Sequence, residues 1–149
     1  MQSISFNLDN PKWKKEFPEY KTIISNAVKK TFQTENVNSH NNHISVFLTS
    51  DDNIKDLNLK YRNKNKATNV LAFPIQELIE KKNHIGDIAI SLEKIIFESH
   101  KYKIKKNKYL SKIIIHGMLH LLGYNHINDN DYKVMNKIEN RIIKELDCN

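Results

Sequence analysis

One apolar segment, residues 109–122 with the sequence "YLSKIIIHGMLHLL", most constrains how this chain can fold. It predicts a strongly apolar helix that Gly123 would end as the C′ residue. The run is shorter than the about 20 residues that span a bilayer, so we expect a soluble protein. Two histidines, His116 and His120, interrupt it. Because a buried imidazole without a partner carries a desolvation cost, these histidines need an explanation.

The spacing of the histidines in "HGMLHLLGYNH" indicates a shared metal ion. His116 and His120 are four residues apart, which places both rings on one helix face. Gly123 then allows His126 to approach the same point. Three imidazoles with an open fourth position are typical of catalytic zinc, whereas structural zinc sites are closed by four protein ligands. We predict that these three histidines bind one divalent ion, with Zn²⁺ expected because imidazole suits zinc better than magnesium.

The alternative is that the three histidines are ordinary packed residues whose spacing arose by chance. The remaining four histidines are isolated beside polar stretches, and we do not expect them to bind metal: His40, His43, His84 and His100.

Gly117 stands where the H-E-x-x-H pattern of metalloproteases has its general-base glutamate. A metallopeptidase is therefore one candidate class, and Gly117 argues against it. A glycine inside a helix costs about 1 kcal/mol relative to alanine. We therefore expect a close neighbour at this point, which is either a packed strand or substrate.

The charge of the chain favours an anionic partner. The net charge is +7, carried by 22 Lys and 2 Arg, which indicates nucleic acid first and a membrane surface second. The chain also contains 20 Asn and 20 Ile, so a general bias toward Lys, Asn and Ile is the alternative explanation for the positive charge. Against this lysine background Arg62 stands out, because a guanidinium binds phosphate in a bidentate way that lysine cannot. Cys148 is the only cysteine, which excludes an intrachain disulfide and predicts a reducing, cytoplasmic setting.

The 149 residues predict a single α+β domain, 1–149, with one four-stranded sheet covered by about five helices. The predicted strands are 3–8, 43–49, 69–75 and 85–91. The predicted helices are 13–32 (which Pro18 splits or starts), 50–62, 92–102, 109–122 and 129–146.

The segments "HGMLHLLGYNH", "YRNKNKATNVLAFP" (61–74) and "GDIAIS" (86–91) together resemble the YbeY family of bacterial rRNA maturation factors. The resemblance implies a single-strand-specific, metal-dependent endoribonuclease acting in small-subunit rRNA 3′-end maturation and ribosome quality control. It also implies a mixed sheet with a metal cleft in the C-terminal half. The metal ligands carry over to His116, His120 and His126, and the catalytic arginine to Arg62. The implied partners are single-stranded ribosomal RNA and, as further candidates, ribosomal subunit proteins; we expect neither DNA nor a membrane.

The chain departs from the family pattern at four positions. Asn125, Asn65 and Asn69 stand where Asp is usual, and Ala67 stands where Pro is usual. Each Asn keeps a carbonyl acceptor but loses the charge. A lost carboxylate beside a metal ligand can cost about 10- to 100-fold in affinity or activity. The alternative function is a non-catalytic ribosome assembly factor that the metal stabilises.

Three aromatic residues lie within or beside these motifs: Tyr61, Phe73 and Tyr124. They are candidates for stacking on the bases of a single strand. Ordinary packing in the core or at the edge of the sheet is the alternative.

Overall fold

Four short segments with alternating apolar residues form one mixed sheet. The computed structural model describes residues 3–37, 42–75, 84–125 and 127–147. The strands are β1 (Ser3–Leu8), β2 (His43–Thr49), β3 (Val70–Pro74) and β4 (His84–Ser91). Their order is β1-β2-β4-β3, with β1, β2 and β4 parallel and β3 antiparallel to β4. The predicted α+β class with a four-stranded mixed sheet is confirmed.

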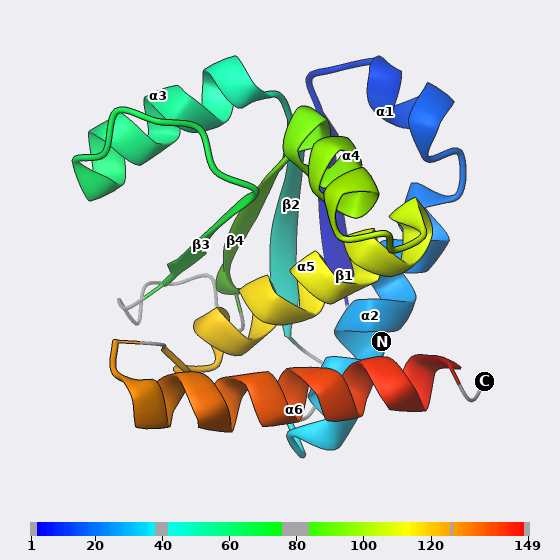
Figure 1. Cartoon of the computed structure of the whole chain (residues 1–149), viewed down its shortest axis with the longest axis vertical. Helices are drawn as coiled ribbons and strands as arrows, with labels where there is room; N and C mark the ends of the chain where they lie inside the picture. The colour runs from blue at the N-terminus through cyan, green and yellow to red at the C-terminus, as the bar shows by residue number, and fades with distance from the viewer. Residues whose placement is uncertain (1–2, 38–41, 76–83, 126, 148–149) are drawn as a thin grey trace.

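Six helices lie in the described part of the chain (Figure 1). They are α1 (Lys12–Glu16), α2 (Tyr20–Thr34), α3 (Asp51–Arg62), α4 (Leu92–Lys101), α5 (Lys106–Leu121) and α6 (Asp129–Asp147). Pro18 divides α1 from α2, which gives one helix more than the five expected. In addition, α5 begins three residues before the predicted start at Tyr109, because the polar first turn exposes its side chains to solvent and only later residues are buried.

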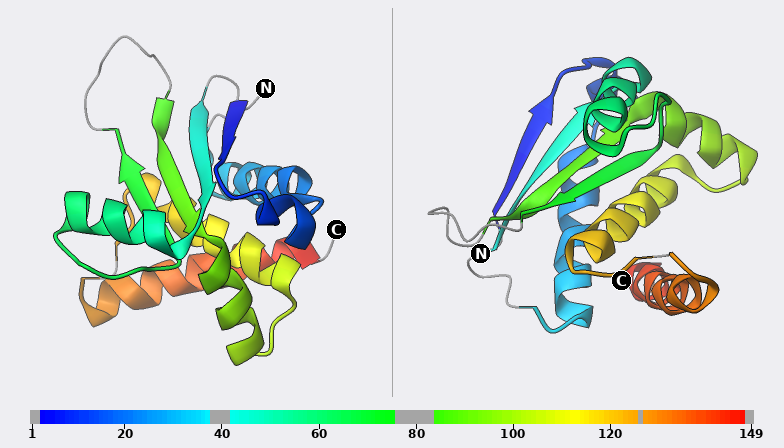
Figure 2. Two further views of the ribbon diagram at one scale, coloured as in Figure 1. Left: turned by 90° about the horizontal axis from the view of Figure 1, so that it is seen from above. Right: turned by 90° about the vertical axis from the view of Figure 1, so that its left-hand side faces the viewer.

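Helix α5 lies at the centre of the molecule. Figure 2 shows the sheet as one layer, with α2 and α5 along one side and α6 beyond α5. The main core joins these helices to Ile88 and Ile90 of β4 and includes fully buried residues of α5 such as Ile114 and Met118. The apolar run that dominates the sequence is therefore covered on most of its circumference.

A smaller apolar cluster lies on the opposite face of the sheet. Its buried members are Ile54 of α3, Leu71 of β3 and Ala89 of β4. Because side chains alternate along β3, Leu71 faces α3 while Val70 faces α5. One strand thus contacts both helices that matter for the site described below.

Gly117 is the point where α5 comes close to the sheet. A Cβ atom at this position would lie 3.3 Å from side-chain atoms of Ile88 and Val70. Of the two neighbours expected from the sequence, the packed strand is therefore present. The absence of a side chain at Gly117 lets the helix carrying His116 and His120 lie directly against β3 and β4.

The helices in the described ranges include none with both the length and the apolar character that a bilayer crossing requires.

Candidate active site

His116 and His120 project together from the surface of α5. Their ring centroids lie 4.7 Å apart, and the two Nε2 atoms lie 3.1 Å from each other. Both rings are half-buried. The i,i+4 spacing on a regular helix is sufficient to produce this convergence.

The other nitrogen of each ring faces an acceptor. His116 Nδ1 lies 3.0 Å from Oε2 of Glu139 on α6, and His120 Nδ1 lies 3.0 Å from the carbonyl oxygen of Tyr124. A carboxylate oxygen and a carbonyl oxygen accept hydrogen bonds, so both contacts suit the ring tautomer that carries its proton on Nδ1. That tautomer directs the lone pairs of both Nε2 atoms to one place.

The turn after α5 supplies the acceptor for His120. Gly123 has a φ of 104°, its N–H donates to the carbonyl of His120, and the N–H of Tyr124 donates to the carbonyl of Leu119. This is a Schellman motif with Gly123 at C′, as the sequence predicts. The motif brings the carbonyl oxygen of Tyr124 within hydrogen-bonding distance of Nδ1 of His120.

The donor set fits a metal ion at this position. Two nitrogens at about 2.0–2.1 Å from one tetrahedral zinc ion lie about 3.3–3.4 Å from each other, close to the 3.1 Å between the Nε2 atoms. A carboxylate or carbonyl on the remote nitrogen is the usual partner of a metal-binding histidine. His126, the predicted third ligand, lies outside the described residues. Within the described ranges, no group of three metal-binding side chains assembles.

Arg62, the last residue of α3, faces the same cleft as the two histidines. Its Nη2 atom donates to the carbonyl oxygen of Ala72 on β3 at 2.8 Å, and its guanidinium lies 4.9 Å from the centre of the Phe73 ring. These contacts hold the planar group in one orientation. A guanidinium has five N–H donors, so it can hold the Ala72 carbonyl and also bind an anion.

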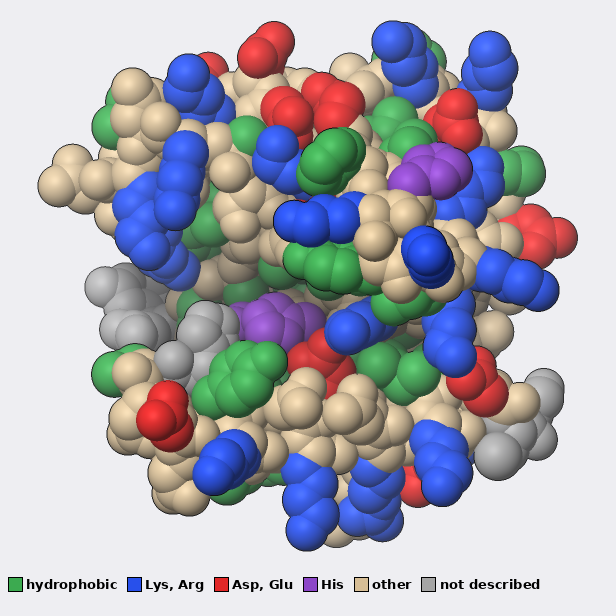
Figure 3. All heavy atoms as spheres, in the orientation of Figure 1, with side chains coloured by type: hydrophobic (Ala, Val, Ile, Leu, Met, Phe, Trp, Pro, Cys, Tyr) green, Lys and Arg blue, Asp and Glu red, His purple; other side chains and the backbone are tan. Residues whose placement is uncertain are grey.

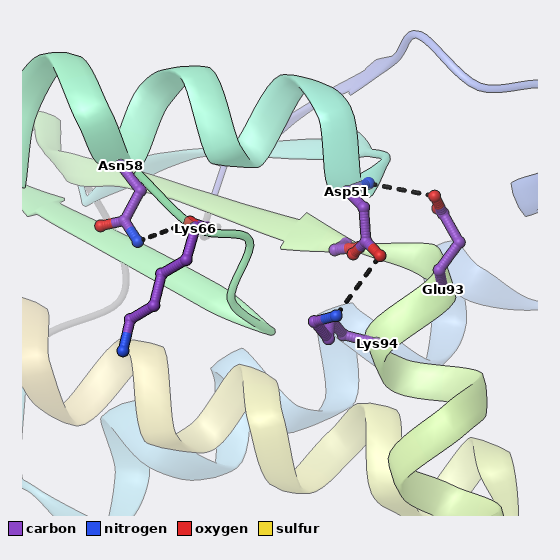
Figure 4. Close-up of polar contacts among 6 residues, drawn as sticks. Asp51, Asn58, Lys66, Glu93 and Lys94 are labelled. Carbon is purple, nitrogen blue, oxygen red and sulfur yellow. Dashed lines mark hydrogen bonds and ion pairs between the residues drawn. The ribbon is translucent and has the colours of Figure 1, made fainter. Parts of the chain in front are cut away.

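The loop after Arg62 is folded back toward α5. Asn63 ends α3 with a φ of 57°, and the buried side chain of Asn58 donates to the carbonyl oxygen of Lys66 at 2.9 Å. Figure 4 shows the Lys66 side chain extending from this loop toward α5. Lys66 therefore adds a second cation on the wall opposite the histidines.

Helix α3 is itself anchored to the start of α4. The Asp51 N–H donates to the Glu93 carboxylate at 3.1 Å, and its own carboxylate pairs with Lys94 at 3.4 Å (Figure 4). Both ends of α3 are thus tied to neighbouring segments, which fixes the upper wall of the cleft.

The cleft between these walls has a volume of about 500 Å³. Its described lining holds Arg62, Lys64 and Lys66 beside His116 and His120, without a carboxylate. Figure 3 shows the hollow crossing the face, with histidine in its floor and lysine and arginine along its upper side. The cleft therefore suits a phosphate group.

Asn69 has a partner that the sequence did not suggest. Its side-chain amide donates to Oε1 of Glu98 on α4 at 2.9 Å, and the hydroxyl of Tyr109 donates to the same oxygen at 2.7 Å. Burial raises the pKa of the Tyr109 hydroxyl, and the Glu98 carboxylate raises it further. An aspartate at position 69 would face Glu98 directly, so the asparagine matches its surroundings.

The other departures from the family pattern have different surroundings. Asn125 is exposed, and its Oδ1 accepts from the N–H of Ile127 at 3.4 Å, so it supports the turn. Ala67 packs against the small apolar cluster under α3, and Asn65 is exposed.

The three aromatic candidates differ in their contacts. Tyr124 packs against the main core and donates its hydroxyl to Glu35, the residue that follows α2, and this contact raises the pKa of Tyr124. Tyr61 is 53% exposed and lies edge-on to Phe73 at 5.3 Å. Packing explains Tyr124 and Phe73, whereas the exposed Tyr61 ring contacts Phe73 and the Lys60 ammonium, which lies 5.1 Å from the ring centre.

Glu139 is the site residue that the sequence interpretation missed. Only 4% of its surface is exposed, although it is charged and lies on an amphipathic helix. It follows Met135 by four residues and precedes Ile142 by three, which places it on the apolar face of α6. The sequence does contain a signal for Glu139, because a charged residue stands there among the apolar positions of the predicted helix.

Replacing Glu139 with glutamine should weaken metal binding by about 10- to 100-fold while the fold persists. The amide keeps the shape of the carboxylate but removes the negative charge that faces Nδ1 of His116. Metal affinity of Glu139→Gln is measured by competition with a zinc-binding dye. Asp147→Asn is the matched control, because Asp147 lies on the same helix and pairs with Lys108. Equal affinity of both variants and the parent chain would show that Glu139 acts only in packing.

Replacing Asn69 with aspartate should destabilise the fold by about 1–3 kcal/mol, because a charge-assisted hydrogen bond becomes a repulsive carboxylate pair. Adding Glu98→Gln should recover most of the loss, since the glutamine amide can then donate to Asp and its oxygen can accept from Tyr109. Denaturant unfolding of the single and double variants measures the free energy of unfolding that is lost and then recovered. If the second substitution adds to the loss instead, the Asn69 to Glu98 contact is not the source of stability.

The mixed sheet, its covering helices and the basic cleft define a class of small α+β proteins with two histidines in a cleft whose charge suits phosphate. Within this class, residues 7–147 match the sequence model of Endoribonuclease YbeY. Endoribonuclease YbeY of Wolbachia sp. subsp. Drosophila simulans is 33% identical over 146 residues, covering 98% of this chain and 97% of the relative. That of Syntrophomonas wolfei is 35% identical over 156 residues, covering 98% and 97%. The chain belongs to the endoribonuclease YbeY family, as its motifs predict.

A solved structure agrees with this assignment. The solution structure of TM1509 from Thermotoga maritima superposes with a TM-score of 0.61 at 29% identity, covering 95% of this chain and 87% of that one. The fold is therefore shared along almost the whole length.

Proposed function

We propose that this protein is a metal-dependent endoribonuclease that cleaves single-stranded RNA during maturation of the small-subunit rRNA 3′ end and in ribosome quality control. The observation that carries the proposal is the convergence of the two Nε2 atoms, 3.1 Å apart, in the cleft that Arg62 and Lys66 line from the opposite wall. The names of the relatives support RNA as the substrate.

His116 and His120 would hold the metal ion, with His126 as the third ligand. When bound, a divalent ion supplies Lewis-acid chemistry and lowers the pKa of a coordinated water toward about 7. We expect Zn²⁺ in this role, and we expect the protein to act in the cytoplasm with ribosomal RNA and ribosomal subunit proteins as partners.

The protein side chains position the phosphodiester. Phosphoryl transfer gathers negative charge on the oxygens of the transferred group, so oriented cations account for much of the catalysis. Arg62, held by the Ala72 carbonyl, would bind one such oxygen, and Lys66 would approach from the same wall. A dedicated glutamate base at position 117 is not needed for this chemistry.

Cleavage of a labelled single-stranded RNA tests the proposal directly. We expect cleavage by the purified protein, its loss on treatment with a chelator, and its return with added Zn²⁺, whereas a duplex of the same sequence remains intact. RNA affinity should fall steeply as salt rises and depend little on sequence, because lysines contact phosphates. Binding without cleavage under all these conditions would instead support the non-catalytic assembly factor.

A further inference from the structure

A second hollow adjoins the cleft on the other side of His116. It has a volume of about 380 Å³ and shares His116 and Asn69 with the first hollow. It lies between the C-terminal end of α4, the α5 surface and the first turns of α6. In Figure 3 the depression continues from the histidines across this face of the molecule. Because the two hollows meet at His116 and Asn69, a chain with one phosphate in the cleft can place its next nucleotide in the second hollow.

Two exposed tyrosines stand at this second hollow. Tyr102 follows the last turn of α4 and is 54% exposed, and Tyr132 lies in α6 and is 58% exposed. Tyr102 is supported by the buried Tyr109, with ring centroids 6.1 Å apart. Both residues line the second hollow and are more than half exposed, and the Lys101 ammonium lies 5.5 Å from the centre of the Tyr102 ring.

The two hollows differ in the charged side chains that line them. The cleft has Arg62, Lys64 and Lys66 without a described carboxylate, whereas the second hollow has one lysine, Lys112, and the carboxylate of Glu139. A phosphate belongs in the first environment. A neutral, flat and partly apolar group belongs in the second, and a nucleobase has these properties.

We propose that the hollow between Tyr102 and Tyr132 is a base-binding subsite, where the unpaired base of a nucleotide next to the cleaved phosphate stacks on tyrosine. This inference rests on the proposed function. Lys112 is placed to contact the backbone of the same nucleotide. Bases inside a duplex are stacked on their neighbours and cannot enter, so the subsite gives a physical reason for preferring single strands. Stacking accepts any base, which agrees with weak sequence dependence.

The test combines changes in the protein with changes in the RNA. Affinity and kcat/KM are measured for a short labelled RNA and for a series in which one base at a time is removed, leaving an abasic nucleotide. Tyr102→Ala with Tyr132→Ala should weaken binding by about 5- to 150-fold, while the corresponding Phe variants stay close to the parent. The control is Phe97→Ala, an aromatic residue of α4 that is 63% exposed and lines a different hollow.

The decisive result is coupling between the two changes. One abasic position next to the cleaved bond should lose affinity with the parent protein and lose nothing further with the double Ala variant. If the losses simply add, or if the double variant binds as well as the parent, the subsite is wrong while cleavage by the parent still supports the proposed function. If the parent protein neither binds nor cleaves the RNA, both proposals fall together.

Discussion

Arg62→Ala should lower the rate of RNA cleavage by about 10²- to 10³-fold, the usual cost of removing one preorganised donor to a developing anion. Arg62→Lys should lose nearly as much, although it keeps the charge. The structure gives the reason, because the guanidinium is held by the Ala72 carbonyl and the Phe73 ring in a fixed plane. A lysine ammonium has no plane to orient and cannot bind an oxygen pair in a bidentate way.

The second arginine of the chain provides the control for this measurement. Arg141 lies on α6, is 70% exposed and pairs with Glu145, so Arg141→Lys should cleave at the parent rate. Metal content and thermal stability should stay nearly unchanged in all three variants. Wild-type cleavage by Arg62→Lys would show that this position contributes only charge, and wild-type cleavage by Arg62→Ala would remove it from the mechanism.

The double substitution His116→Ala with His120→Ala should abolish metal binding and cleavage together. Metal per chain, measured by elemental analysis, should fall from near one toward zero. The two Nε2 atoms face one point only because both rings lie on one turn of α5, and a single remaining imidazole cannot fix an ion in place. Retained full stoichiometry would falsify the shared metal site.

Folding of the histidine variant requires its own check, since both rings are half-buried beside the core. The single variants His116→Asn and His120→Asn keep polar groups of similar size and should each reduce metal content. His100→Ala is the control, because His100 is an exposed residue of α4 that lines a different hollow. Its metal content and cleavage should equal those of the parent.

Most of the fold could be predicted from local patterns. Each strand was placed within one residue at either end, because alternation of apolar residues marks which segments are buried on a sheet face. Gly123 was identified correctly because a positive φ after a helix favours glycine. The start of α5 was predicted three residues too late, because "KKNK" contains no apolar side chain and residues 106–108 are exposed in the structure.

The site was only partly predictable, for a physical reason. His116 and His120 are only four residues apart, so their convergence on one helix face could be predicted from the sequence alone. The partners of these and neighbouring residues are distant in sequence: Glu139 lies 23 residues from His116, and Glu98 lies 29 residues from Asn69. Such pairs arise from helix packing. The interpretation of Asn69 as simply a lost charge therefore missed the carboxylate to which it donates.

The contact at Gly117 makes the width of the cleft a property of the apolar core. Val70 and Ile88 lie against the bare backbone of α5, and the strand that carries Val70 also carries Ala72, which holds Arg62. The separation between the histidines and the arginine is therefore set by van der Waals contact, which neither salt nor pH alters. Packed side chains yield little to small forces, so we expect the two halves of the site to keep their spacing when a substrate binds. Adding or removing one methyl group at position 70 or 88 would therefore change the distance between the histidines and Arg62, as a thicker or thinner spacer would, without altering the histidines or the arginine.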